Sequence, residues 1–252
     1  FIGAEGNLFE ETPEQCNQLK VVEPILTNHD LEKIRSVSEG RVKAKTLRTL
    51  FRPGKGPGAL KRSLESLCSQ ASEAVRDGYT ILVLSDRGVD REHAPIPSLL
   101  ATAGVHHHLI REGVRTRVGL VVESGEPREV AHFALLFGYG AGAVNAYLAL
   151  ETLAQLVDQG LLPTTDYTTA EQKFIRATHK GVVKVMSKMG ISTLQSYRGA
   201  QIFEAVGLNQ GFIDEYFKWT STRIGGIGLG EIEEESRLRH ALAFLDAKSI
   251  GS

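Results

Sequence analysis

A run of ionisable side chains follows directly after one of the most apolar stretches of the chain. Residues 79–84 read YTILVL, and the residues that could do chemistry come next: Asp86, Arg87, Asp90, Arg91, Glu92 and His93. Loops after buried strands are where α/β proteins usually hold their ligands. Alternating acids and bases are equally typical of a loop held by ion pairs, and the sequence identifies no nucleophile with its base. Both interpretations stay open.

Three consecutive histidines occupy positions 106–108. Consecutive helix residues project about 100° apart, so they cannot converge on one metal ion as an i, i+4 pair can. A solvated helix face or packing beside a site is the favoured interpretation. Cys16 and Cys68 form neither a CxxC nor a Cys/His spacing. This pattern argues against a disulfide framework and a structural zinc site, and it favours a reducing compartment.

Residues 138–143, GYGAGA, match the GxGxxA form of a dinucleotide fingerprint, with Asp158 at a suitable distance downstream. The fingerprint must follow a strand and open a helix, whereas the residues before Gly138 have helical periodicity. Helix capping and close packing by small residues is therefore favoured. The second glycine-rich run, RIGGIGLG at 223–230, is predicted to be a connector and not a phosphate loop.

Composition excludes several classes of partner. The chain has 29 basic and 30 acidic residues, a net charge of -1, and both signs are mixed along it. Such a balance gives no electrostatic footprint for nucleic acid or an anionic membrane. No apolar run approaches the roughly 20 residues of a membrane span, and no secretory signal core is visible. The chain begins with Phe1 and not Met, so we expect a soluble segment of a larger polypeptide.

Helical and strand patterns alternate through the first part of the chain. Helices are expected at 60–77, 98–111, 127–137 and 146–159, each ending near a glycine of the kind that caps helices. Residues 79–84 and 118–123 have the apolar content of strands buried on both faces. This alternation predicts parallel βαβ units with right-handed crossovers. Residues 42–50 are ambiguous.

A segment rich in Pro, Asp and Thr at 161–170 predicts a domain boundary, which divides the chain into 1–165 and 166–252. Beyond it we expect helices at 170–186, 199–206 and 210–218. A strand is expected around MGISTL at 189–194, and a charged helix from residue 231.

Several long blocks together resemble the glutamate synthase large subunit, the flavin and iron-sulfur enzyme that uses glutamine nitrogen to convert 2-oxoglutarate into glutamate. The blocks are GAEGNLFEETPEQC, ILVLSDRG, APIPSLLATAGVHHHLIREG, VVESGEPREV, FGYGAGAVNAYLALE, VMSKMGISTLQSYRGAQIFEAVGL and STRIGGIGLGEI. They run through nearly the whole chain, and their amino-acid sequences are most similar to the ferredoxin-dependent branch of cyanobacteria and plastids. Ala146, where the family tends to have Pro, and KWTSTRIGG, where it tends to read GTxSRIGG, depart from the pattern.

The resemblance implies an α/β fold, with a parallel βαβ central domain followed by the first elements of a flavin (β/α) barrel. Residues 1–165 match the C-terminal part of the central domain, which couples the amidotransferase to the synthase site and helps wall the ammonia tunnel. Residues 166–252 match the beginning of the FMN-binding barrel. The implied partners are the amidotransferase domain, the rest of the barrel and the β-helix of the same polypeptide, with ferredoxin as electron donor, in the cytoplasm or plastid stroma.

The same match places flavin-side residues in MSKMGIS and SYRGAQ: Ser187, Met189, Gly190, Ile191, Ser192 and Gln201. The parent enzyme would carry FMN and a 3Fe-4S cluster. This chain lacks the family's N-terminal cysteine nucleophile, the three closely spaced cluster cysteines and the later barrel segments. We therefore expect it to act as scaffold and tunnel wall, binding no cofactor and catalysing nothing alone.

Two functions from other classes are weaker alternatives. One is a non-catalytic α/β module that binds a small anionic metabolite at the SDRG and GYGAG loops. The other is a nucleotide-dependent dehydrogenase built on GYGAGA. A partial barrel also leaves strand edges and apolar faces unpaired, which predicts self-association of the isolated segment.

Overall fold

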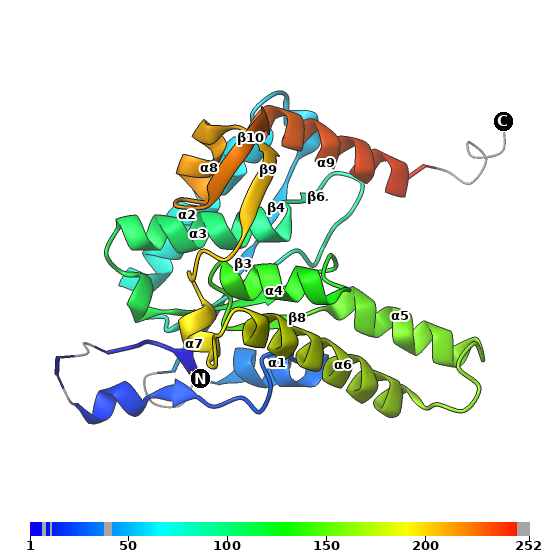
Figure 1. Cartoon of the computed structure of the whole chain (residues 1–252). Helices are drawn as coiled ribbons and strands as arrows, with labels where there is room; N and C mark the ends of the chain where they lie inside the picture. The colour runs from blue at the N-terminus through cyan, green and yellow to red at the C-terminus, as the bar shows by residue number, and fades with distance from the viewer. Residues whose placement is uncertain (7–8, 11, 38–41, 246–252) are drawn as a thin grey trace.

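A parallel sheet forms the centre of the computed structural model, which describes residues 1–6, 9–10, 12–37 and 42–245 (Figure 1). The four strands lie in the order β3 (Ala44–Arg48), β5 (Ile81–Ser85), β7 (Gly119–Glu123) and β8 (Ala143–Asn145). Successive strands are joined by α2 (Ala59–Arg76), α3 (Ser98–Arg111) and α4 (Val130–Gly138). The prediction of an α/β fold with parallel βαβ units is confirmed.

Both faces of this sheet are covered, by different parts of the chain. Every residue of β5 and β7 is buried. The chain advances one strand at a time in the same direction, which with the usual crossover handedness places α2, α3 and α4 on one face. Leu82, Leu84 and Leu120 pack there with α2 and α3. The alternate residues Ile81 and Val83 face the opposite way and need another cover.

The N-terminal segment and α1 (Asn28–Ser36) supply that cover. Ile2 and Leu31 are almost fully buried against the second face of the sheet. Strands β1 (Ile2–Gly3) and β2 (Gln18–Leu19) form an antiparallel pair, and β1 lies against β7. The segment before α1 continues the sheet beyond β8, because the Leu26 N–H donates to the Val144 carbonyl at 2.8 Å.

Two long helices follow, of which α6 (Tyr167–Lys188) packs beside α4 and α5 (Tyr147–Asp158) packs against α6. Figure 1 shows α6 running alongside α4, with α5 next to it. Ile175 and Val182 of α6 share one apolar cluster with Phe133 and Phe137 of α4. Elements on the two sides of residue 165 therefore share a core.

The C-terminal elements form a second, smaller βαβ unit that rests on the first. Its members are β9 (Glu204–Leu208), α8 (Gln210–Tyr216), β10 (Ser221–Ile227) and α9 (Leu229–Ala243). The two strands are parallel, α8 contacts α3, and α9 contacts α2. Figure 1 shows this unit at the top. A short antiparallel pair, β4 (Leu50–Phe51) and β6 (Ala94–Pro95), completes the sheets. No helix in the described ranges has both the length and the apolar content of a membrane span.

The prediction of a strand around MGISTL is wrong, because these residues end one helix and begin the next. Gly190, with φ 70, ends α6, and the Ile191 N–H donates to the Met186 carbonyl in a capping turn. The Thr193 hydroxyl then accepts from the Ser196 N–H and begins the short helix α7 (Leu194–Tyr197). Backbone groups used for two helix caps are not free for a sheet ladder.

Two further local predictions are also wrong. Residues 199–206 contain no helix, since β9 begins at Glu204, and the predicted connector at 223–230 contains most of β10. Ala205 is buried while Glu204 and Val206 are exposed, which is strand alternation. These strands form because they pair with each other, one before α8 and one after it. The periodicity of one strand does not reveal its partner.

Gly119 tests the close packing of the N-terminal cover on β7. A Cβ at this position would lie 2.6 Å from the backbone nitrogen of Gly3. We expect Gly119→Ala to lower the free energy of unfolding by about 1–3 kcal/mol, because backbone cannot yield as a flexible side chain can. Urea denaturation measures it, with Gly54→Ala as the control, since a Cβ at Gly54 meets no atom within 4 Å. Equal losses in the two variants would contradict this packing.

The β9–β10 pair tests the expected self-association. Among the described residues these strands pair only with each other, and they expose Val206 (66%) and Ile224 (60%). We expect light scattering to give a mass above the monomer, because open edges with apolar side chains pair between molecules. Ile224→Lys should lower this mass. Leu161→Lys, at an equally exposed apolar residue outside the β9–β10 pair, should not. A monomeric parent chain would contradict the expectation.

Candidate functional site

Polar side chains gather at the carboxyl edge of the central sheet. Ser85, Glu123 and Asn145 end β5, β7 and β8, and the register sets Glu123 between the other two. All three are buried, with exposures of 3% or less. The carboxyl ends of parallel strands are where α/β folds usually bind ligands, so this edge is the first place to look for chemistry.

Glu123 is the centre of this edge. Its carboxylate accepts hydrogen bonds from Arg87 Nε at 2.6 Å, from Arg35 Nη2 at 2.5 Å and from the Ser85 hydroxyl. Burial alone would raise the pKa of Glu123, but these hydrogen bonds and the charge of Arg35 hold it below its usual value. A charged, fully partnered carboxylate therefore joins α1 to the ends of two strands.

Asp86 forms a second buried carboxylate next to the first. It accepts from the Ser124 hydroxyl at 2.5 Å and from the Gly125 N–H at 3.1 Å. Burial raises its pKa, and the hydrogen bonds, including one from Tyr147, oppose the rise. The Arg87 guanidinium lies 4.1 Å from the centre of the Tyr147 ring, a cation–π contact that joins the loop after β5 to the start of α5.

These contacts favour the ion-pair interpretation of the loop after β5. Glu123 is 1% exposed and already bonded to three side chains, so it cannot serve as an acid or base for a substrate. Further along, the Asp90 carboxylate accepts from the backbone N–H groups of Glu92 and His93. His240 of α9 contacts the Asp90 carbonyl at 2.7 Å. These bonds hold the carboxyl ends of the strands together. We call the network of Arg35, Ser85, Asp86, Arg87 and Glu123 the carboxyl-edge lock.

The three histidines face different neighbours, as their helical spacing predicts. His106 accepts from Arg115 Nε at 2.8 Å, whereas His108 Nε2 lies 2.8 Å from the Ser72 hydroxyl on α2. Burial, with the charge of Arg115, lowers the pKa of His106 to about 2. The part of the chain that the structure describes contains no group of three or more His, Cys, Asp or Glu side chains able to hold a metal ion.

GYGAGA serves close packing between α4 and β8. Tyr139 ends α4, and the run leads into a strand and not a helix. Gly140, with φ 115, lies so near His106 that a Cβ would come within 2.3 Å of its ring nitrogen. GYGAG precedes β8, whereas SDRG follows β5, so the two loops lie at opposite edges of a parallel sheet. They cannot form one metabolite site.

The residues expected beside the flavin do not gather round one cavity. Ser187 and Met189 lie on the exposed end of α6, and Gly190 and Ile191 form its capping turn. Ser192 lines a cavity beside α6, whereas Gln201 lines a neighbouring cavity under α3. Gln201 also precedes β9, while the cofactor of a (β/α) barrel lies beyond the carboxyl ends of the strands. By themselves these residues do not fit FMN, and their flavin contacts stay a prediction.

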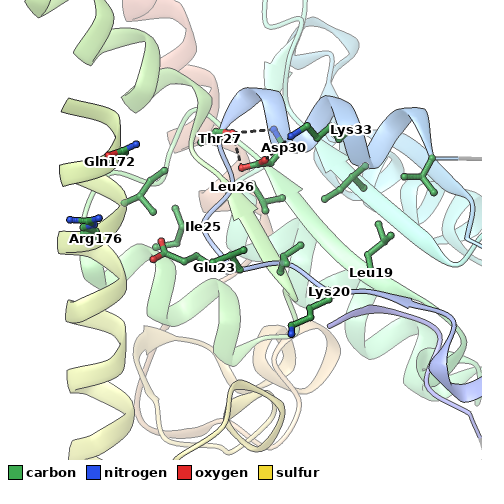
Figure 2. Close-up of a pocket in the computed structure, with 15 residues that line it drawn as sticks. Leu19, Lys20, Glu23, Ile25, Leu26, Thr27, Asp30, Lys33, Gln172 and Arg176 are labelled. Atoms are coloured by element: carbon green, nitrogen blue, oxygen red, sulfur yellow. Dashed lines mark hydrogen bonds and ion pairs between the residues drawn. The ribbon is translucent and has the colours of Figure 1, made fainter. Parts of the chain in front are cut away.

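A further cavity, of about 470 Å³, lies between α1, α6 and the segment before α1 (Figure 2). Its floor is apolar, with Ile25 and Leu26 nearly buried. Figure 2 shows Gln172 and Arg176 reaching it from α6, while Asp30 and the α1 cap Thr27 lie on the opposite side. The Thr27 hydroxyl donates to Asp30 Oδ2 at 2.7 Å. The sequence alone does not reveal this cavity, because its walls come from segments about 150 residues apart.

A model of the protein family described as the glutamate synthase central domain matches residues 1–209. The chain belongs to this family. The match runs past residue 165, so the predicted division at that point stays a prediction.

Curated glutamate synthases align with almost the whole chain. The NADPH-type large chain of Bacillus subtilis is 44% identical over 98% of this chain. The NADH-type enzyme of Schizosaccharomyces pombe is 41% identical over 100%, and the ferredoxin-dependent enzyme of Pyropia yezoensis is 37% identical over 98%. The chain spans only 16%, 12% and 17% of these glutamate synthases, respectively.

Among solved structures, a mutant flavocytochrome b2 with benzoylformate is similar at 12% identity and a TM-score of 0.47. The likeness covers 68% of this chain and 37% of that one. A likeness this weak supports no inference about a barrel or a cofactor. The barrel that glutamate synthases of this kind would place after the central domain stays a prediction for residues beyond 166.

The Glu123 network yields a pH-dependent test. We expect Glu123→Gln to lower the free energy of unfolding at pH 7 by about 3 kcal/mol, because it leaves two guanidinium groups facing a neutral amide. A carboxylate with a lowered pKa stabilises the fold above its ordinary pKa, and this stabilisation is lost as the pH falls through the folded-state value. The difference between wild type and variant should therefore shrink in acid.

Chemical denaturation at neutral and acid pH measures both effects. Asp86, whose pKa is raised, titrates in wild type and variant alike and cancels from the difference. Glu73→Gln, at an exposed position, is the matched control and should change little at either pH. A Glu123→Gln deficit that is the same at both pH values would contradict a charged Glu123 at the centre of the lock.

Proposed function

We propose that this chain is the central-domain segment of a glutamate synthase and acts as scaffold and ammonia-tunnel wall. One observation carries the proposal: curated glutamate synthases align with 93–100% of the chain, which spans only 12–17% of their length. The segment then works with the amidotransferase domain, the rest of the barrel and the β-helix of one polypeptide.

The geometry of the carboxyl edge supports a scaffold role. Its two buried carboxylates are bonded to arginine, hydroxyl and backbone groups, so neither is free to move a proton. A rigid, water-poor wall is what a channelled intermediate needs, since channelling depends on excluding solvent and holding shape. The proposed contribution of the chain is positioning.

In the proposed whole enzyme, glutamine is hydrolysed at a remote site and ammonia travels inside the protein. The ammonia condenses with 2-oxoglutarate, and the resulting 2-iminoglutarate is reduced to glutamate. FMN would supply the hydride in that enzyme, and a 3Fe-4S cluster would supply the electrons; the proposal assigns no step on either group to residues of this chain. Ferredoxin is the proposed electron donor, on the resemblance of the sequence blocks to the ferredoxin-dependent branch. Sequence identity does not separate the donors, because relatives named for NADPH or NADH are 37–44% identical to this chain and those named for ferredoxin are 36–40%.

Cysteine chemistry fits the proposed reducing compartment, the cytoplasm or plastid stroma. Cys16 and Cys68 are both free thiols. Burial raises the pKa of Cys68 to about 11, so this thiol stays protonated and unreactive at neutral pH.

The isolated chain should neither bind FMN with high affinity nor turn over. We expect no saturable change in flavin fluorescence on titration, and no glutamate formation from glutamine and 2-oxoglutarate with reduced ferredoxin or NADPH. The expected flavin contacts Ser192 and Gln201 lie in different cavities, which is the physical reason. Turnover by the chain alone would overturn the proposal.

A chimera tests the positive side of the proposal. These residues replace the aligned segment of the Bacillus subtilis large chain, to which they are 44% identical over 246 residues. We expect glutamine-dependent glutamate synthesis, with glutamine consumption and glutamate formation coupled and little free ammonia released. The same chimera with Gly119→Ala, whose Cβ would meet the Gly3 backbone, should leak ammonia or fail to assemble. A folded chimera that hydrolyses glutamine without making glutamate would contradict the scaffold role.

A further inference from the structure

A cavity of about 270 Å³ lies between α3, the end of α4 and the loops that enter β9 and β10. Four large aromatic rings contribute to its walls: Tyr139 and Phe203 stack with centroids 5.9 Å apart, and Tyr197 and Trp219 also line the space. The volume is slightly below the usual range of small-molecule sites, about 300 to 1,000 Å³. Flat walls and this size suit a small planar molecule.

The charge of the cavity has one sign. Its lining includes Lys218 and Arg198 but no aspartate or glutamate. Arg198 is paired with Glu5 at 3.0 Å. Lys218 is different, because within the described ranges no carboxylate lies at ion-pair distance from it, and its ammonium lies 5.6 Å from the centre of the Trp219 ring. An unneutralised ammonium at an aromatic wall selects an anion.

A polar atom without a partner lies in the same wall. His107 is 7% exposed, and its Nε2 has no hydrogen bond to any described group. Burial, with the charges of Arg111 and Lys218, lowers its pKa to about 4, so the ring is neutral at pH 7. Buried polar atoms are nearly always bonded, and this exception belongs to a residue in the wall of the cavity.

The backbone around the cavity is held in an uncommon conformation on two sides. Gln201 and Trp219, with φ 54 and 69, are the non-glycine residues in the described ranges with positive φ, and both line the cavity. A bulky side chain adopts this conformation only where its surroundings impose it. The Tyr139 and Thr220 hydroxyls lie 2.7 Å apart and fasten the Trp219 turn to the end of α4.

We propose that this cavity binds a small carboxylate with a flat, apolar body, such as an aromatic acid. The carboxylate pairs with Lys218, and the body stacks among the aromatic walls. The proposal does not depend on the role of the chain in glutamate synthase. It concerns a site that shares no residue with the carboxyl-edge lock.

The test uses benzoate as the probe and Trp219, the single tryptophan of the chain, as the reporter. We expect a saturable change in the intrinsic fluorescence of the full chain, and equilibrium dialysis with labelled benzoate should give the same dissociation constant. Benzamide, with the same shape and no charge, should bind at least about tenfold more weakly, since its neutral carbonyl accepts a weaker hydrogen bond from Lys218 than a carboxylate does.

Two lysine variants complete the test. Lys218→Gln should weaken benzoate binding about tenfold or more, and Lys184→Gln, at an exposed position on α6, should leave it unchanged. Lys218 is exposed, so its variant keeps the fold. A fluorescence change that never saturates, equal binding of benzamide, or equal binding by the two lysine variants would each overturn the proposal. None of these outcomes bears on turnover, which tests the glutamate synthase role separately.

Discussion

The structure depends on one constraint, which is that the central parallel sheet has apolar side chains on both faces and must be covered twice. The connecting helices α2, α3 and α4 advance in one direction and share one face. The other face would be open to water if the chain began at β3. The N-terminal segment and α1 close it, and this requirement explains why Ile2 and Leu31 are almost fully buried.

The cover is also fixed electrostatically. Arg35 reaches from α1 to Glu123 at the end of β7, and Arg87 reaches the same carboxylate from the loop after β5. A buried charge with one partner missing is costly, so the cover, the strand and the loop stabilise one another through this carboxylate. The position where an α/β fold usually binds its ligand is thereby filled by its own side chains. A carboxyl edge filled in this way is what the proposed scaffold role requires.

The second βαβ unit rests on the helices of the first, with α8 against α3 and α9 against α2. Its strands pair with each other, and much of their apolar surface is exposed. The aromatic cavity lies where the loops of this unit meet the ends of α3 and α4. A ligand there would contact both units at once.

The sequence by itself determined the elements whose evidence is local. YTILVL, the glycine-stopped helices and their alternation predicted β5, α2, α3 and the parallel βαβ order, and long blocks such as ILVLSDRG predicted the family. The helical spacing of His106, His107 and His108 predicted that they project in different directions, and His106 and His108 contact Arg115 and Ser72. These features depend on backbone conformation and burial of neighbouring residues, which periodicity records.

Tertiary structure decided everything that needs a distant partner. β9 and β10 form by pairing across α8, whereas residues 199–206 alone have a helical pattern. The Arg35–Glu123 bond joins residues 88 positions apart, and the cavity at Trp219 draws its walls from four separate segments. Sequence identified Asp86 and Arg87 as candidates, but only the fold showed that they are bonded to Ser124 and Glu123. Local sequence limits which backbone conformations have low free energy. Long-range contacts then select among them, because burial and charge pairing depend on residues that are distant in the sequence.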